Sequence, residues 1–339
     1  MEIVDDIQYD VIGFGALNVD KLFTVDEIAC HDEERSIISE EESPGGSAAN
    51  TIIGLANLGL TTSYIGKIAD DAEGELLEYN LAEHGVYLNN LIYSDTGVSG
   101  KVLGFVDQNG ERALYVDTGV NETIELDEIN PIELARGHII HYTSMFGETF
   151  QTQKDLISRL PESMILSFDP GLIYAKLGVD ELKVILDRTD ILLINENEMF
   201  ILYEDYYRKR DNIPEDENLS FRDLAIKIRD DGIDTVIVKR GTKGAYGINS
   251  NDDEVKVPAF LVDAKDTTAA GDSFNAGFLY SYVKGFDLEK SVTVGNWVAS
   301  KAVQEMGISG LPMIDDLEDF LEEYDKENDG DKILFKKIN

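Results

Sequence analysis

Asp272 follows a run of small residues, residues 268–271. Its position suggests that its carboxylate takes part in a reaction. Apolar residues at helical spacing predict a helix from about Asp272 to Lys284, after a strand-like segment that ends at Asp266. The opening turn of a helix presents unpaired N–H groups and the positive end of the helix dipole, and it therefore attracts anions. A carboxylate there would repel a phosphate unless it accepts a proton from a hydroxyl nucleophile. The alternative is that Asp272 only caps the helix, since Asp is a favoured N-cap.

Polar residues also follow the first predicted strand, residues 9–18, and a glycine-rich loop. Asn18 and Asp20 close that strand, where an open α/β sheet commonly binds its ligand, although a simple turn is equally consistent. The loop of residues 43–50 contains Gly46, precedes a predicted helix and places Asn50 in its first turns. Glycines let a backbone approach a ligand closely, so this loop is a second candidate for ligand binding.

Further polar residues follow two later strands. Asn195 and Glu198 are three residues apart and share one face of an opening helical turn, where an amide and a carboxylate could hold a hydrated Mg²⁺ beside a phosphate. Capping of that helix is the alternative role of Glu198. Lys239 begins a glycine-rich turn with Gly241 and Gly244. Asn296 is a polar residue within an otherwise apolar helix.

Composition restricts the class of protein. The chain of 339 residues has 29 basic and 67 acidic residues, a formal net charge of −38, which makes nucleic acid and anionic membranes poor partners. Its single cysteine, Cys30, excludes an internal disulfide and suits a reducing compartment. No apolar run approaches the roughly 20 residues of a membrane span. We expect a soluble cytoplasmic protein with no nucleic-acid or membrane partner.

The elements that must position these residues form an α/β pattern. From residue 139 onward, predicted strands at 139–142, 164–168, 191–194 and 235–239 alternate with helices, which indicates a parallel sheet with helices on both faces. Short extended segments within about 19–40 and 98–118 form a separate flap, and Asn109-Gly110 marks a hairpin turn between the last two. We expect a single domain over residues 1–325, followed by a polar, loose tail at 326–339.

Taken in order, these segments resemble the ribokinase-like (PfkB) family of carbohydrate kinases. The resemblance covers about residues 9–325, and residues 266–272 are its most specific motif. It implies a three-layer α/β/α sandwich with a central, mostly parallel sheet and a small β-sheet lid. It also implies an ATP- and Mg²⁺-dependent kinase that phosphorylates a primary hydroxyl of a small sugar, with K⁺ as a further cofactor, and a homodimer formed through the lids.

The resemblance also implies a role for each residue. Asp272 is the expected general base, and the N–H groups of Ala269, Ala270, Gly271 and Asp272 form the anion hole. The residues expected to bind the substrate are Asn18, Asp20, Gly46 and Asn50. Those expected at the ATP site are Asn195, Glu198, Lys239, Gly241, Gly244 and Asn296. Glu198 is expected to hold Mg²⁺ through water. The backbone at Asp266 and Thr268 and the turn of residues 307–309 are expected to bind the monovalent cation.

Other functions remain open from the sequence. Ser47 is small where ribose kinases usually carry Lys, which leaves room for a larger acceptor and keeps a nucleoside kinase of the same family possible. A sugar-binding regulator without catalysis is less consistent with Asp272 and the anion-hole sequence, since a binding protein needs no base there. An ADP-dependent kinase fits less well, because those relatives usually carry larger lids.

Overall fold

The computed structural model describes residues 7–109 and 111–336, with side chains described up to residue 326. Its main sheet has the strand order β13-β12-β11-β10-β9-β8-β1-β4-β5. The pairs from β11 through β5 are parallel, and only β12 and β13 join antiparallel. The strands are β1 (Tyr9–Phe14), β4 (Thr62–Ala69), β5 (Leu91–Ser94), β8 (Gly137–Thr143), β9 (Ile165–Asp169), β10 (Ile191–Asn195), β11 (Thr235–Lys239), β12 (Ala245–Asn249) and β13 (Glu254–Val257).

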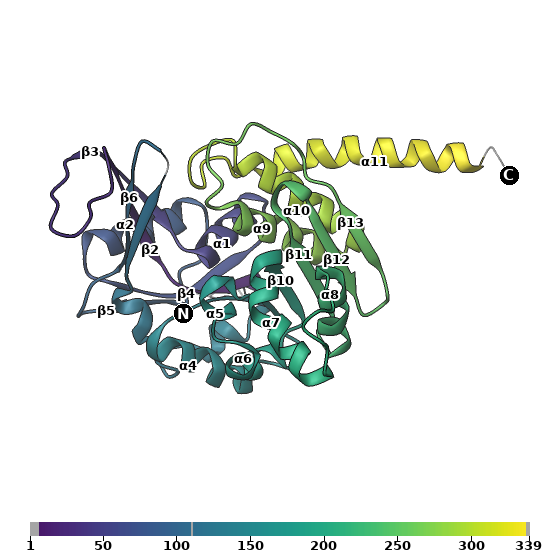
Figure 1. Ribbon diagram of the computed structural model, residues 1–339, viewed down its shortest axis with the longest axis horizontal. Helices are drawn as coiled ribbons and strands as arrows, with labels where there is room; N and C mark the ends of the chain where they lie inside the picture. Colours follow the sequence, from purple (N-terminus) through teal and green to yellow (C-terminus); the bar gives the residue numbers. More distant parts are fainter. Residues whose placement is uncertain (1–6, 110, 337–339) are drawn as a thin grey trace, which may run out of the picture.

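Helices cover both faces of this sheet (Figure 1). Within β10, Leu192 and Ile194 pack into one buried cluster with α4, α6, α7 and α8, whereas Ile191 and Leu193 pack into a second with α1, α9 and α10. Alternate residues of one strand therefore face opposite layers, and a strand buried on both sides must be apolar throughout. The helices are α1 (Ser47–Asn57), α2 (Ala72–Glu83), α3 (Pro131–Leu134), α4 (Gly147–Leu156), α5 (Gly171–Ala175), α6 (Val179–Leu186), α7 (Glu196–Asp211), α8 (Phe221–Asp230), α9 (Ala270–Val283), α10 (Leu288–Ala302) and α11 (Ile314–Lys336), with 3₁₀ turns η1 (Gly119–Thr123), η2 (Ile157–Arg159) and η3 (Gly241–Lys243). The predicted three-layer sandwich is confirmed.

A second, four-stranded sheet stands beside the first and matches the predicted flap (Figure 1). Its order is β3-β2-β6-β7, from β2 (Asn18–Val25), β3 (Ile37–Gly45), β6 (Gly100–Val106) and β7 (Arg112–Asp117). β6 and β7 pair antiparallel, as the hairpin prediction requires, although Gly110 of the predicted turn lies outside the described residues. β3 extends further than predicted, because residues expected to form the start of a loop pair with β2 as far as Gly45.

Two predicted boundaries are wrong. Residues 262–266 form no strand, and α9 begins at Ala270, since alanine and glycine at 270 and 271 accept helical dihedrals. The loose tail expected from residue 326 is instead a continuation of α11, which runs to Lys336 and projects from the body of the molecule (Figure 1). This segment is polar but contains no proline and several good helix formers, so its polarity does not prevent a helix.

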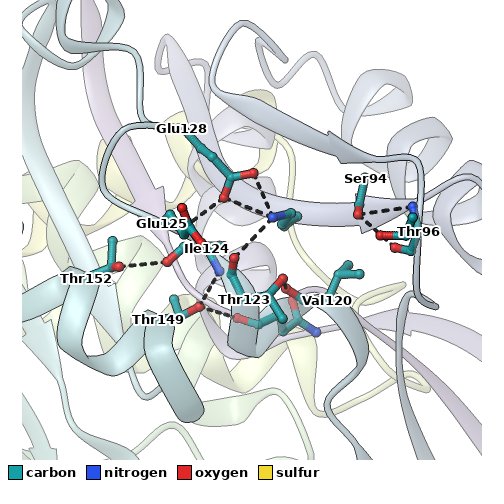
Figure 2. A network of polar contacts seen from close by, with 11 residues as sticks. Ser94, Thr96, Val120, Thr123, Ile124, Glu125, Glu128, Thr149 and Thr152 are labelled. Carbon is teal, nitrogen blue, oxygen red and sulfur yellow. Dashed lines mark hydrogen bonds and ion pairs between the residues drawn. The ribbon is translucent and has the colours of Figure 1, made fainter.

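A network of polar contacts fixes the chain where it returns from the lid to the main domain (Figure 2). The Lys67 Nζ of β4 donates to the Thr123 carbonyl at 3.1 Å and to both carboxylate oxygens of Glu128, at 2.7 and 2.9 Å. Thr149 of α4 accepts from the Ile124 N–H and donates to the Asn121 carbonyl, at 2.8 and 2.7 Å. These contacts join β4, η1 and α4, and they hold the end of the lid at a fixed place on the main sheet.

Glu128→Ala should lower the free energy of unfolding by about 1 to 2 kcal/mol, because it leaves the largely buried Lys67 ammonium with one carbonyl partner. Urea unfolding followed by circular dichroism measures the change. The control is Glu322→Ala, which removes an exposed ion pair to Lys326 and should have no measurable effect. Equal midpoints for Glu128→Ala and the wild type would contradict this role of the network.

Candidate active site

The predicted site residues gather at the carboxyl edge of the main sheet. Asp169, Asn195 and Lys239 are the last residues of β9, β10 and β11, and the parallel pairing of these strands brings their ends to one edge. The first turns of α1 and α9 meet at the same edge, where the Asn50 Nδ2 donates to the Asp272 Oδ2 at 2.9 Å. Segments more than 200 residues apart in the chain therefore share one site.

Asp272 does not cap its helix. The N-cap of α9 is Ala269, and Asp272 lies within the first turn, where its carboxylate accepts the hydrogen bond from Asn50. Burial, together with the charges of Asp169 and Glu198, raises the pKa of Asp272 to about 7, against the Asn50 hydrogen bond and the charge of Lys239, which both lower it. A carboxylate with a pKa near neutrality has the proton affinity that a general base needs.

The first turn of α9 leaves backbone N–H groups open. The Ala270 N–H donates to the Thr267 carbonyl at 3.3 Å, but within the described part of the chain the N–H groups of Ala269, Gly271 and Asp272 have no hydrogen-bond acceptor. Such groups bind anions at the positive end of a helix. The predicted anion hole is therefore geometrically available at Ala269, Gly271 and Asp272, while the N–H of Ala270 is partly engaged.

A cleft of about 1060 Å³ lies beside this turn, between the lid and the main domain. Of the residues predicted to bind substrate, Asp20 and Asn50 line it, together with Gly45. Burial raises the pKa of Asp20 to about 6, and no hydrogen bond to its carboxylate is present among the described residues. Asp20 thus offers a carboxylate with free acceptor positions to a ligand in the cleft.

The other two predicted substrate residues have structural contacts. The Asn18 Oδ1 accepts from the Asn121 Nδ2 at 3.1 Å, and Asn121 also bonds both backbone groups of Leu17. Gly46 is the N-cap of α1 with a φ of 121°, and a Cβ at this position would lie 2.2 Å from the Ala16 carbonyl oxygen. Any residue larger than glycine would displace the start of α1, and with it Asn50.

Asn195 and Glu198 form the capping box that was the alternative to a magnesium role. The Asn195 Oδ1 accepts from the Glu198 N–H at 2.9 Å, and the Glu198 Oε2 accepts from the Asn195 N–H at 3.1 Å. Burial and the charge of Asp169 raise the pKa of Glu198. The pair is therefore a fixed structural unit, and it lies near enough to Asp169 for their charges to interact.

Two residues predicted for ATP binding, Gly244 just before β12 and Asn296 of α10, meet at the end of β13. Gly244 has a φ of 84° and lies against the backbone of Val257. A Cβ at this position would be 2.0 Å from the Val257 carbonyl oxygen. The Asn296 Nδ2 donates to the carbonyls of Val257 and Pro258, both at 3.3 Å. Gly241 opens the η3 turn between β11 and β12. These contacts shape the chain after β13, and they leave nucleotide contact as a prediction.

Asp266 links the two loops expected to bind a monovalent cation. Its Oδ1 accepts from the Thr268 N–H and hydroxyl at 2.9 and 2.6 Å, and its Oδ2 accepts from the Gly307 N–H at 2.9 Å. The loops around Thr268 and Gly307 are thus held side by side, and cation binding by their backbone stays a prediction. Among the described residues, no group of three or more His, Cys, Asp or Glu side chains could hold a metal ion directly.

A family model for pfkB family carbohydrate kinases matches residues 9–314. The chain belongs to the pfkB family of carbohydrate kinases. It is 37% identical over 265 residues to an uncharacterized sugar kinase of Archaeoglobus fulgidus, which covers 77% of this chain and 98% of the relative. It is 31% identical to an ATP-dependent ribose-1-phosphate kinase of Halopiger xanaduensis, over 92% of this chain and 98% of the relative. A crystal structure of the Methanocaldococcus jannaschii nucleoside kinase, an archaeal member of the ribokinase family, is 25% identical with a TM-score of 0.78, over 93% of this chain and 99% of that one.

This pfkB-family kinase is a phosphotransferase of the sugar and nucleoside kinase class with a ribokinase-like fold. Within the described part of the kinase, no helix combines the length and the apolar character needed to cross a membrane.

Two residues of the site escaped the sequence reasoning. Neither Asp169 nor Asn275 is among the predicted site residues, yet both contact the Lys239 ammonium in the interior of the kinase. The usable signal for Asp169 was its position directly after an apolar strand. Asn275 carries no local signal, because its role depends on how α9 lies against β9 and β11.

The pH dependence of the kinase should report Asp272. A base acts only when deprotonated, so kcat/KM should rise with pH up to about 7 and then level off. Asn50→Ala removes a hydrogen bond that favours the charged carboxylate and should move this rise to higher pH, whereas Asn251→Ala, an exposed change in the β12–β13 turn, should not. A rate independent of pH between 5.5 and 8 would contradict the assignment.

Proposed function

We propose that this protein is an ATP-dependent kinase that transfers the γ-phosphoryl group to a primary hydroxyl of a small sugar. The observation that carries the proposal is the first turn of α9. This turn carries the open N–H groups of Gly271 and Asp272. It also carries the Asp272 carboxylate, which has a pKa of about 7, and it lies beside a large cleft. A base and an anion site in one helical turn match the two requirements of phosphoryl transfer to an alcohol.

In this proposal, each group acts on one part of the reaction. The Asp272 carboxylate accepts the proton of the attacking hydroxyl. The N–H groups from Ala269 to Asp272 stabilise the charge that develops on the γ-phosphoryl oxygens. Asp20 and Asn50 line the cleft. They form hydrogen bonds with the hydroxyls of the acceptor that do not react, and these bonds orient the acceptor toward Asp272.

The residues at the sheet edge fit a phosphate-bound Mg²⁺ held through water. Asn195 and Glu198 give this edge an amide and a carboxylate, the groups that hold a hydrated Mg²⁺. Because Asn195 and Glu198 already bond one another, they would contact the ion through water molecules. Mg²⁺ supplies charge neutralisation on the phosphates when it is bound with ATP. Gly241, Gly244 and Asn296 would line the ATP site, and the Asp266–Gly307 contact supports a K⁺ site on the adjoining backbone.

A nucleoside is the second candidate acceptor. Ser47 is small and exposed at the start of α1, and the cleft of about 1060 Å³ exceeds what a monosaccharide needs. The structural similarity to a nucleoside kinase is consistent with this alternative. A regulator without catalysis would have no use for a buried base beside open N–H groups.

The test measures ADP release from MgATP with pentoses, hexoses, nucleosides and ribose-1-phosphate as acceptors. Asp272→Asn should lower kcat on the best acceptor by about 10²-fold or more, because it removes the general base. The control is Asp180→Asn, which neutralises a first-turn carboxylate on the distant helix α6 and should leave kcat unchanged. Undiminished kcat in Asp272→Asn would return Asp272 to a structural role. Binding of a sugar without turnover of any acceptor in the wild type would favour the regulator.

We further propose a cytoplasmic homodimer that pairs through the lids. The outer strands of the lid expose apolar side chains, since Ile37 and Ile38 of β3 are 53% and 59% exposed and Leu114 and Val116 of β7 are 51% and 53% exposed. Exposed apolar residues on the edge strands of a sheet favour association with a second sheet.

Light scattering coupled to size-exclusion chromatography should give about twice the chain mass of 37.7 kDa for the wild type. Leu114→Glu introduces a charge into the proposed contact and should give the mass of one chain. Val184→Glu, at a similarly exposed position on α6, should remain a dimer. A monomeric wild type would exclude pairing through the lids.

A further inference from the structure

A buried cluster of charged and amide groups lies inside the kinase, where β9, β11 and α9 meet. The Asp169 Oδ2 accepts from the Lys239 Nζ at 2.6 Å and from the Asn275 Nδ2 at 2.7 Å. The Lys239 Nζ also donates to the Asn275 Oδ1 at 3.1 Å, which closes the cluster. Asp169 and Asn275 are 7% and 0% exposed, so neither interacts with bulk water as a surface pair would.

This cluster lies close to the proposed anion hole. A Cβ added at Gly271 would be 3.5 Å from the Lys239 Nζ, so the ammonium lies close to the first turn of α9. Asn275 is one helical turn beyond Asp272, on the same side of α9. The cluster therefore connects two strand ends to the turn that carries the open N–H groups.

The placement of Lys239 is electrostatically unusual. A cation at the N-terminus of a helix opposes the helix dipole, and a buried ammonium loses its hydration. Both costs are offset here by carboxylates on three elements, since the charges of Asp169, Glu198 and Asp272 raise the pKa of Lys239 against the effect of burial. Lys239 thus stays charged and adds positive charge close to a site that must bind phosphate.

The groups that face Asp272 come from several elements. Asp169 of β9 and Glu198 of α7 are negative, and Lys239 of β11 is positive. Asn50 of α1 donates to the carboxylate, and the buried phenol of Tyr64 in β4 lies close enough to be influenced by its charge. Lys239 is therefore the cation whose charge opposes those of Asp169 and Glu198 at Asp272.

We propose that Lys239 is a positioning residue for phosphoryl transfer, held by Asp169 and by Asn275 of α9 so that its ammonium stays beside the first turn of α9 and its charge acts on the Asp272 carboxylate. This assignment rests on the proposed role of Asp272 as the base. It replaces the predicted contact of Lys239 with ATP, because the ammonium is already bonded to two side chains of the interior.

The test measures how the charge of Lys239 affects the titration of Asp272 when the carboxylate of Asp169 is absent. Asp169→Asn removes a carboxylate and leaves the ammonium facing Asp272, so Asp272 should lose its proton at lower pH than in the wild type. The double variant Asp169→Asn with Lys239→Met removes the ammonium as well, and the titration should return toward higher pH. Titration of ¹³C-labelled aspartate followed by NMR measures this directly, with Asp272 identified as the signal absent from Asp272→Asn.

The pH dependence of catalysis provides the second measurement. The ratio of kcat/KM at pH 6 to that at pH 8 should rise about fivefold in Asp169→Asn and fall again in the double variant, as expected for a shift of about one unit. Thermal unfolding of each variant verifies folding, and Lys239→Arg in the wild-type background should keep the wild-type profile because it keeps the charge.

Identical Asp272 titrations in Asp169→Asn and the double variant would overturn the proposal, since a purely structural lysine changes stability without moving that titration. The NMR measurement does not depend on turnover. A wild type that phosphorylates no acceptor would therefore refute the proposed function while the shift at Asp272 still tested the cluster.

Discussion

The unpaired N–H groups at the start of α9 are the constraint on which the rest of the site depends. Every helix begins with such groups, and most proteins satisfy them with a capping side chain. Here the N-cap is Ala269, which has no polar side chain, and the carboxylate in the first turn instead bonds Asn50. The turn therefore keeps both an anion site and a base. The parallel sheet holds it against the ends of β9, β10 and β11, and the lid closes the cleft on the other side.

Charge balance explains why the site is assembled from so many elements. A carboxylate buried alone would remain protonated at neutral pH, whereas one paired too closely with a cation would be too weak a base. Asp272 lies between these limits, since burial, Asp169 and Glu198 raise its pKa to about 7 while Asn50 and Lys239 lower it. No single segment of the chain could supply these opposing influences. The parallel strand ends bring them together, although the residues are far apart in the sequence.

Much of the fold and part of the site follow from local patterns. The sequence predicted the alternation of strands and helices after residue 139 and the short strands of the lid. Both can be recognised because the spacing of apolar residues over a short stretch indicates a strand or a helix. Asp272 and Asp20 were identifiable as carboxylates next to glycine-rich or strand-end segments. The first residue of α9 could not be identified from the sequence, because alanine and glycine are compatible with both a loop and a helix. Nor could the contact of Asp169 with Asn275, which are 106 residues apart and meet only through the packing of α9 on the sheet.

A crystal structure with a non-hydrolysable ATP analogue, Mg²⁺ and the best acceptor tests the central claim most directly. We expect the acceptor's primary hydroxyl within about 2.6 to 3.2 Å of the Asp272 carboxylate, in line with the γ-phosphorus, and γ-phosphate oxygens bonded to the N–H groups of Gly271 and Asp272. A γ-phosphate held elsewhere, or an acceptor whose hydroxyl contacts another base while Asp272 bonds only Asn50, would contradict the assignment of this turn as the catalytic centre.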